Sequence, residues 1–276
     1  MLFRSPVNGS DEALYLAFRA FGGPGRRFAF PAVSYSFYPV FAAVTGTQAM
    51  PVPLRPDFSI DPADYAGLDA SIVIANPNAP TGLALTLPQI ESILQADPDR
   101  LVIIDEAYVD FGTQSCVALT ARYDNLLVTQ TFSKSRSLAG ARLGFAIGDP
   151  ALIADLNTVR NSVNPYNVNR MTQAAGIAAI RENDYFMGCC QTIRKNRTDA
   201  IAQLRSMGFT VLESQANFVF ARCDAMPGTA LYAALRRRGV LVRHFDTPAL
   251  TDWLRITIGT QDQMAALLNT DAGGLN

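Results

Sequence analysis

The sequence predicts an α/β protein in which a mostly parallel sheet, flanked by helices, forms a large domain that a small α+β C-terminal domain follows. Continuous apolar runs of strand length recur along the first half of the chain, at residues 70–75, 101–106, 125–131 and 143–148. Such runs are typical of strands that are buried on both faces of a parallel sheet. Segments with helical spacing lie between strands, as in parallel α/β folds. We expect the large domain to span residues 1–185 and the small domain residues 186–276.

The N-terminal part should begin with a helix. Apolar residues at helical spacing follow the segment 8–12, where Ser10 or Asp11 can cap the helix, and glycines at 22–25 end it. A short strand is expected at 28–30, followed by a helix that ends near residues 45–46. A strand with two prolines is expected at 49–54, where it should take an edge or loop position, and a helical turn should start at 57–61. A further helix is expected from about residue 88 to residue 96.

The C-terminal part has a different pattern. Residues 167–207 have helical spacing with Gly188 as one interruption, which predicts two helices. The order strand, strand, helix, strand, strand, helix follows, at 209–212, 217–220, 228–238, 240–243, 253–258 and 261–268. This order is typical of a small α+β unit.

Composition excludes several classes of partner. The 276 residues carry a formal net charge of −1, which gives no electrostatic reason to expect nucleic acid or an anionic membrane as partner. No run approaches the roughly 18 apolar residues of a membrane-spanning helix. One histidine and four cysteines, none in a CxxC pair, argue against a zinc site or a disulfide framework and favour a reducing cytoplasm.

Polar side chains follow three of the predicted strands. Asn78, Asp105 and Lys134 each lie just past a strand end. In parallel sheets, ligands bind beyond the carboxyl ends of the strands, so these three residues should meet at one edge and mark a ligand site.

The stretch 131–136 holds Lys134 between small hydroxyl residues, and Arg142 follows eight positions on. Thr131 and Ser133 offer hydroxyls, and the planar guanidinium of Arg142 can hold a phosphate through two hydrogen bonds. Ser10 and Asp11, at the expected helix start, can contribute backbone N–H groups to an anion. From these residues alone, an ordinary surface loop and a plain helix cap remain alternatives.

Five segments together resemble a known family. They are Asn8-Gly9-Ser10-Asp11-Glu12, Asn76-Pro77-Asn78-Ala79-Pro80-Thr81-Gly82, Asp105-Glu106-Ala107-Tyr108, Thr131-Phe132-Ser133-Lys134 with Arg142, and Arg255-Ile256-Thr257-Ile258-Gly259-Thr260. Each alone is a weak signal, but five in order and at similar spacing are specific. The chain resembles, over essentially its whole length, the fold-type I aminotransferases that depend on pyridoxal 5'-phosphate, and most closely the histidinol-phosphate aminotransferases.

The resemblance implies roles for the cofactor residues. Lys134 would form the Schiff base and move the proton, and Asp105 would keep the pyridine nitrogen protonated, although a strand-end aspartate can also be structural. Asn78 and Tyr108 would bond the ring hydroxyl. Tyr35 would stack on the ring, unless it is a core aromatic. The cofactor phosphate would be held by Ser10, Asp11, Thr131, Ser133 and Arg142.

Two arginines are the candidates for substrate binding. The resemblance implies that Arg255 and Arg243 meet the anionic end of the substrate. Arg255 lies inside an apolar strand and therefore needs a partner, which could instead be a salt bridge on the sheet face. Arg243 could instead be a surface residue. His244 is expected to have no catalytic role.

The activity that the resemblance implies is transamination between L-histidinol phosphate and 2-oxoglutarate in histidine biosynthesis, with a small-molecule amino donor and a 2-oxo acid acceptor as partners. Alternatives on the same scaffold are an aromatic or broad-range aminotransferase and an enzyme like phosphothreonine decarboxylase. A non-enzyme, either an inactive fragment or a regulatory cofactor-binding domain, is a further alternative. Family members carry a segment before the Asn8-Gly9-Ser10 motif that this chain is expected to lack, and the full-length form is expected to be a homodimer.

Overall fold

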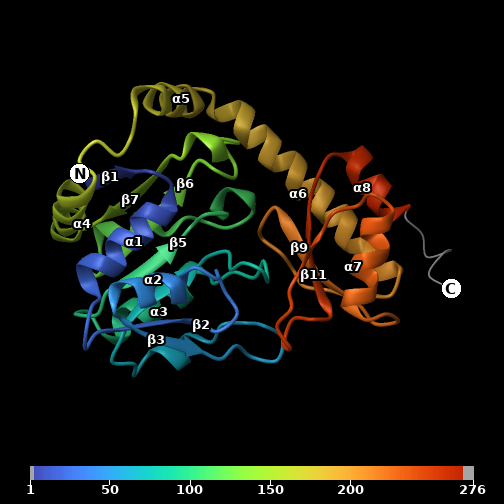
Figure 1. Cartoon of the computed structure of the whole chain (residues 1–276), viewed down its shortest axis with the longest axis horizontal. Helices are drawn as coiled ribbons and strands as arrows, with labels where there is room; N and C mark the ends of the chain where they lie inside the picture. The colour runs from blue at the N-terminus through green and yellow to red at the C-terminus, as the bar shows by residue number, and fades with distance from the viewer. Residues whose placement is uncertain (1–2, 270–276) are drawn as a thin grey trace.

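The computed structural model describes residues 3–269 and shows two lobes that are joined by a long helix (Figure 1). The larger lobe is built on a seven-stranded sheet in the order β1-β7-β6-β5-β4-β2-β3. Its strands are β1 (Phe3–Val7), β2 (Arg27–Pro31), β3 (Gln48–Val52), β4 (Ser71–Ala75), β5 (Val102–Asp105), β6 (Leu126–Thr131) and β7 (Gly144–Gly148). The expected edge position of β3 is confirmed.

Most neighbouring strands of this sheet run parallel, as predicted, but the strands at one end do not. The strands β3, β2, β4, β5 and β6 pair in parallel, whereas β7 is antiparallel to both β6 and β1. The connection 132–143 between β6 and β7 holds only one short helical turn, η4 (Ala139–Ala141). This connection contains no α-helix of the kind that usually crosses over between parallel strands, and β7 runs back antiparallel to β6.

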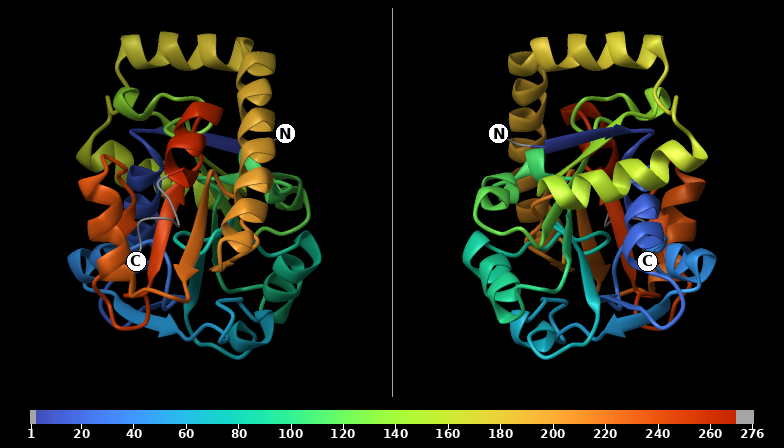
Figure 2. Two further views of the ribbon diagram at one scale, coloured as in Figure 1. Left: turned by 90° about the vertical axis from the view of Figure 1, so that its right-hand side faces the viewer. Right: turned by 90° about the vertical axis from the view of Figure 1, so that its left-hand side faces the viewer.

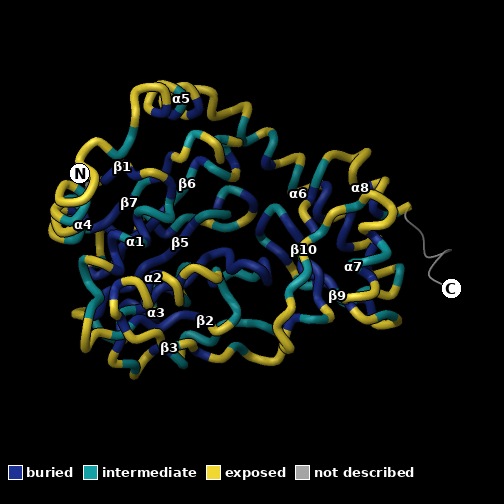
Figure 3. Tube along the Cα trace, in the orientation of Figure 1, coloured by how far each residue is buried: buried dark blue, intermediate teal, exposed yellow. Residues whose placement is uncertain are grey.

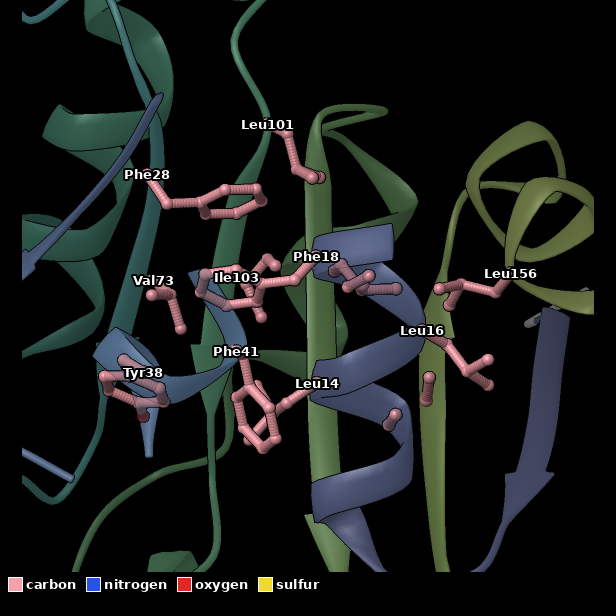
Figure 4. Close-up of a cluster of buried hydrophobic side chains, with 14 of the residues drawn as sticks. Leu14, Leu16, Phe18, Phe28, Tyr38, Phe41, Val73, Leu101, Ile103 and Leu156 are labelled. Atoms are coloured by element: carbon pink, nitrogen blue, oxygen red, sulfur yellow. The ribbon is translucent and has the colours of Figure 1, made fainter. Parts of the chain in front are cut away.

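Helices cover both faces of the sheet. On one face lie α1 (Ser10–Phe21), α2 (Tyr38–Thr45) and α4 (Pro150–Val163), whose buried side chains form one core cluster with those of the strands (Figure 4). In α1 the buried residues Ala13, Leu14, Ala17 and Phe18 repeat at helical spacing, and Phe18 stacks on Phe28 of β2 with ring centroids 4.1 Å apart. The opposite face is covered by α3 (Leu87–Ala96) and the short helices η1 (Pro62–Tyr65) and η3 (Cys116–Ala121).

Several elements of the large lobe had no sequence prediction. The strand β1 is short and contains Pro6, so it lacks the continuous apolar run of the central strands. In α4 only Ile153 and Leu156 are buried, which leaves a weak apolar stripe. A turn after β5, η2 (Val109–Phe111), was also not predicted.

The helical region 167–207 forms α5 (Arg170–Arg181) and α6 (Asn183–Ser206), as two helices were expected. The break lies at Glu182, and α6 continues through Gly188, so the predicted interruption at Gly188 is wrong. Figure 2 shows α6 running from α5 toward the small lobe. Because α6 joins both lobes, the boundary between residues 185 and 186 falls in its first turn and stays a prediction.

The small lobe has the predicted α+β order. Its antiparallel sheet has the order β10-β11-β9-β8. The strands are β8 (Phe209–Val211), β9 (Phe218–Cys223), β10 (Arg243–His244) and β11 (Trp253–Thr257), and the helices are α7 (Gly228–Arg237) and α8 (Gln261–Leu268). Side chains from α6, α7, α8 and the strands form its core.

Exposure follows this architecture. In Figure 3 the central strands are dark blue, whereas much of α5 is yellow.

The four cysteines carry free thiols. Within residues 3–269, no helix is both long and apolar enough to span a membrane.

Candidate active site

A cavity at the carboxyl ends of the parallel strands brings the predicted cofactor residues together. Its wall is formed by Ser10, Asp11, Tyr35, Ala75, Ala79, Asp105, Ala107, Tyr108, Thr131, Ser133, Lys134 and Arg142. The positions come from five regions that are far apart in the sequence: the start of α1, the loop after β2, and the ends of β4, β5 and β6 with the loops that follow them. The parallel topology places these ends side by side, as the sequence predicted for Asp105 and Lys134.

Asp105 is the most deeply buried acid of the cavity, with 4% of the residue exposed. The hydroxyl of Tyr38 donates to its Oδ2 at 3.1 Å and that of Thr129 to its Oδ1 at 3.3 Å. Burial raises the pKa of Asp105 to about 6, although these hydrogen bonds oppose the shift. The carboxylate is therefore mostly ionised near neutral pH, as a partner of a protonated ring nitrogen must be.

Tyr38 was not predicted as a site residue. Its fully buried hydroxyl is aimed at Asp105 from the start of α2. The segment Ser34-Tyr35-Ser36-Phe37-Tyr38 contains two tyrosines, and helical geometry alone does not say which of them turns inward.

Lys134 lies on the loop after β6, with its Nζ 5.3 Å from the centroid of the Tyr108 ring. The loop is fixed on both sides of the lysine. Thr131 accepts a hydrogen bond from the backbone N–H of Ser133 at 3.1 Å, and Ser135 donates to Asp110. These contacts give the lysine a fixed backbone, although its own side chain is exposed.

The start of α1 and Arg142 form one corner of the cavity. Arg142 Nη2 donates to Asp11 Oδ2 at 3.1 Å, and Tyr35 donates to Asp11 Oδ1 at 2.8 Å. No side chain caps α1, so its terminus is open to an anion. Gly9 has a φ of +79°, and a Cβ there would lie 2.6 Å from Arg142 Nη2. The sequence therefore needs glycine at this corner, where the guanidinium passes close to the backbone.

Tyr35 lines the cavity as expected, and its ring makes an edge contact with Tyr38 at 5.6 Å. Burial raises the pKa of the Tyr35 hydroxyl, and the hydrogen bond to Asp11 adds to this shift. The hydroxyl therefore stays protonated and holds Asp11 in place beside Arg142.

Asn78 is not part of the cavity wall, where Ala79, one position on, lies instead. It is buried, and both amide hydrogens are used within the protein: Nδ2 donates to Val33 O at 2.9 Å and to Thr81 Oγ1 at 3.1 Å. Its Oδ1 accepts from Ser34 at 2.7 Å. These hydrogen bonds shape the loop, and Oδ1 keeps a second lone pair that could accept from a ring hydroxyl. The bond from Asn78 to the cofactor stays a prediction.

Glu106, next to Asp105, points the other way. It is buried, its Oε1 accepts from the N–H of Cys116 at 2.6 Å, and its Oε2 accepts from Ser115 and from Gln130, each at 2.7 Å. Burial raises the pKa of Glu106. Successive residues of a strand face opposite sides, so the Asp105 carboxylate faces the cavity and the Glu106 carboxylate faces the loop behind it.

Arg243 and Arg255 are not part of the cavity wall, but they lie directly opposite each other on β10 and β11. Their side chains share one face of the small sheet. Within residues 3–269, no acidic side chain forms an ion pair with either. Each guanidinium instead lies over an aromatic ring, 5.1 Å from the centroid of Phe218 for Arg255 and 5.4 Å from that of Phe245 for Arg243.

A chain of aromatic contacts links Arg255 to the cavity. Tyr108 meets Phe218 edge-on with centroids 5.1 Å apart, so Lys134, Tyr108, Phe218 and Arg255 follow one another across the junction of the lobes. The alternative of a sheet-face salt bridge for Arg255 has no partner among the described residues. His244 bonds Thr251 O at 2.8 Å and Asp246 at 3.2 Å, and its lack of a catalytic role stays a prediction.

Comparison with known proteins identifies the class. The family described as aminotransferase class I and II matches residues 6–270. This chain belongs to that family, and the fold and the lysine-centred cavity are those of an amino-group transferase.

Particular relatives narrow the comparison. The chain is 47% identical over 263 residues to a histidinol-phosphate aminotransferase of Acinetobacter baumannii, covering 95% of this chain and 73% of the relative. It is also 47% identical to histidinol-phosphate aminotransferase 2 of Dechloromonas aromatica over 266 residues, or 96% and 74% of the two chains. The fold matches the crystal structure of the histidinol-phosphate aminotransferase of Clostridium acetobutylicum with a TM-score of 0.90 at 24% identity, over 99% of this chain and 83% of that one.

A further solved structure with this fold is a complex with a cofactor. The fold matches that of the histidinol-phosphate aminotransferase of Sinorhizobium meliloti in complex with pyridoxal-5'-phosphate, with a TM-score of 0.86 at 23% identity, over 96% of this chain and 74% of that one. At this identity the likeness concerns the fold.

Proposed function

We propose that this aminotransferase uses pyridoxal 5'-phosphate to convert L-histidinol phosphate and 2-oxoglutarate into imidazole acetol phosphate and L-glutamate, a step of histidine biosynthesis. The names of the relatives at 47% identity support it. The observation that carries it is the arginine pair Arg243 and Arg255, which faces no acid within the described residues and is linked by aromatic contacts to the lysine cavity. An anionic substrate end would neutralise this pair.

The chemistry of the cavity fits the cofactor. One end offers a helix start, two hydroxyls and Arg142 to a phosphate, and the other offers the buried Asp105 to a basic ring nitrogen. When bound, pyridoxal phosphate supplies the electron sink for the reaction. Tyr108 would orient the ring hydroxyl and Tyr35 would lie against the ring.

The protein's own groups then have separate tasks. Asp105 holds a proton on the ring nitrogen, because an ionised carboxylate in a buried setting favours a cationic partner. Lys134 Nζ would be the base that takes up the proton from the substrate carbon bearing the amino group and returns it in the 1,3 proton shift. Arg255 and Arg243 hold the anionic tail, the phosphate of one substrate and the distal carboxylate of the other, and so place the amino group near Lys134.

We further propose that the enzyme is a homodimer that works in the cytoplasm. Large apolar side chains are exposed along α4, α5 and the connection between them, namely Val163, Tyr166, Met171, Ile177 and Ile180. Such a patch is typical of an interface. The four free thiols suit a reducing compartment. Sedimentation over a range of protein concentrations tests the dimer, and a monomer at all concentrations would contradict it.

Two experiments test the proposal. In the first, protein loaded with pyridoxal phosphate is reduced with borohydride and mapped by mass spectrometry, and the pyridoxyl label should lie on Lys134. A label on another lysine removes Lys134 from its role. In the second, glutamate formation from 2-oxoglutarate is measured with L-histidinol phosphate, L-histidinol and aromatic amino acids as donors. A preference for an aromatic amino acid would replace the proposed substrate by the broad-range alternative.

A further inference from the structure

Arg197 of α6 joins the two lobes through backbone carbonyl groups. Its Nη1 donates to Phe111 O of η2 in the large lobe at 2.9 Å and to Ala216 O, just before β9 of the small lobe, at 2.6 Å. The residue is 7% exposed. One nitrogen therefore binds the end of the loop that carries Tyr108 and the start of the strand that carries Phe218.

The position of this cation is unusual in its surroundings. Within residues 3–269, no carboxylate forms an ion pair with Arg197. Burial lowers the pKa of its guanidinium, and the like charge of Arg194 adds to this effect. A buried charge that is held by carbonyl groups and has no ion-pair partner costs free energy, and surface helix residues carry no such cost. The structure therefore contains a destabilising buried charge at the junction of the two lobes.

The segment around Ala216 is held between loops of the large lobe. The N–H of Gln215 donates to Gly82 O at 2.7 Å, across the lobe junction. Gly112, next to η2, lies so close that a Cβ there would be 3.0 Å from Gln215 O and 3.2 Å from Arg197 Nη2. Arg197 therefore closes a tight three-part contact between α6, η2 and the turn 214–216.

This contact stands behind the active site. Ala79, Ala216 and Phe218 form a small buried cluster against which Tyr108 packs. Tyr108 lies below Lys134, and Phe218 lies below Arg255. A shift of η2 relative to β9 would change the separation between the lysine end and the arginine end of the site.

We propose that Arg197 is a positioning residue that sets this separation, and so fixes which length of anionic substrate reaches Lys134. The role rests on the proposed function, because it assumes that Arg255 and Arg243 hold a substrate anion. Arg197 itself lies behind the cavity and contacts neither the lysine nor the arginine pair.

A pair of donors tests the role. L-histidinol phosphate carries the anion that the arginines would bind, and L-histidinol lacks it. In Arg197→Met the ratio of kcat/KM for the two donors should fall roughly tenfold to hundredfold, as expected for a misplacement of about 1 Å. Arg197→Lys keeps the charge and part of the hydrogen bonding, so its ratio should lie between those of Met and the wild type. If Arg197→Met does not fold, the lysine variant carries the test.

Arg205→Met is the matched control. Arg205 lies on the same helix and donates to Val211 O at 2.7 Å, a contact within the small lobe, so its loss should leave the ratio unchanged. Equal losses with both donors in Arg197→Met would show a merely structural role and overturn the proposal. An equal fall of the ratio in Arg205→Met would do the same.

A second measurement does not depend on turnover. Trp253 of β11 is the only tryptophan of the chain. Energy transfer from Trp253 to a pyridoxyl group reduced onto Lys134 should change in Arg197→Met and not in Arg205→Met, and unchanged transfer contradicts the proposal. If the wild type takes no label, the proposed function fails by itself. Amide exchange in the cofactor-free protein then decides: it should quicken at both 109–112 and 216–218 in Arg197→Met only, and exchange unchanged at either segment overturns the role of Arg197.

Discussion

At Asp105, stability and function oppose each other. The side chain is buried, and its pKa is raised to about 6 from an ordinary value of 3.8. Between these two values the folded state holds a proton that the unfolded state has released. The free energy of unfolding therefore falls as pH rises through this window, and above pH 6 the full cost of the buried charge is present. The protein retains a carboxylate that a cationic ligand would have to compensate.

Asp105→Asn should therefore stabilise the cofactor-free protein as pH rises. Between about pH 4.5 and pH 8 its free energy of unfolding should gain roughly 2 kcal/mol relative to the wild type, from the size of the pKa shift. Urea unfolding at both pH values measures it. The same variant should lose transamination, because a neutral amide cannot hold the ring nitrogen protonated. A stability difference that does not vary with pH would contradict the burial of a charged Asp105.

Arg255 offers a test of the substrate end. Arg255→Lys keeps the charge but loses the planar fork, and should cost roughly 1.5–3 kcal/mol in kcat/KM with L-histidinol phosphate, as for a charge-assisted hydrogen bond. With L-histidinol the loss should be much smaller. Steady-state kinetics with both donors measure this, and an unchanged kcat/KM for the phosphorylated donor would place Arg255 outside the site.

Residues at strand ends were predictable because strand direction decides where they go. Asp105 and Lys134 could be assigned to one cavity from the apolar runs before them, whereas Tyr108 was expected there only from the family resemblance. Asn78 follows a strand in the same way, but it is not part of the cavity wall, and its amide donates to Val33 O and to Thr81 Oγ1. Tyr38 and Arg197 were also beyond prediction, since their partners lie 67 and 86 positions away.

Among the elements, α6 is a single helix of 24 residues that takes part in both lobes. Its continuity through Gly188 shows that tertiary packing on either side can override a poor helix former. Periodicity predicted the two helices of this region but not the break at Glu182, which no glycine or proline marks. The antiparallel direction of β7 could not be predicted either, because an apolar run indicates a strand but not its direction.

Gly188→Ala should stabilise the protein by roughly 0.5–1 kcal/mol, since alanine restricts the unfolded chain and favours helix. Gly188 is exposed, and a Cβ there would meet no atom within 4 Å. Thermal or urea unfolding measures the gain, with unchanged kcat/KM as the control. A loss of stability would mean that α6 needs the glycine for a bend.

For the whole molecule, the junction of the lobes predicts coupling between distant residues. If Arg197 positions Arg255, the loss caused by Arg255→Lys should be smaller in an Arg197→Met background, by at least about 0.5 kcal/mol in a double-mutant cycle of kcat/KM. Arg205→Met in place of Arg197→Met should give additive losses. Additivity in both cycles would show that the two ends of the site are placed independently.

The edge strand β3 affects how copies of the protein behave when they are crowded together. Gln48 N–H and Val52 C=O both bond inward to the chain around β2, so the alternate residues of β3 turn their backbone groups outward. Pro51 is one of these, and it has no N–H to offer to an approaching strand. A second molecule that tried to extend the sheet at this border would find a donor missing in the middle of the template. Because Pro51 removes a donor from the outer edge of β3, it opposes edge-to-edge extension of the sheet in a concentrated solution.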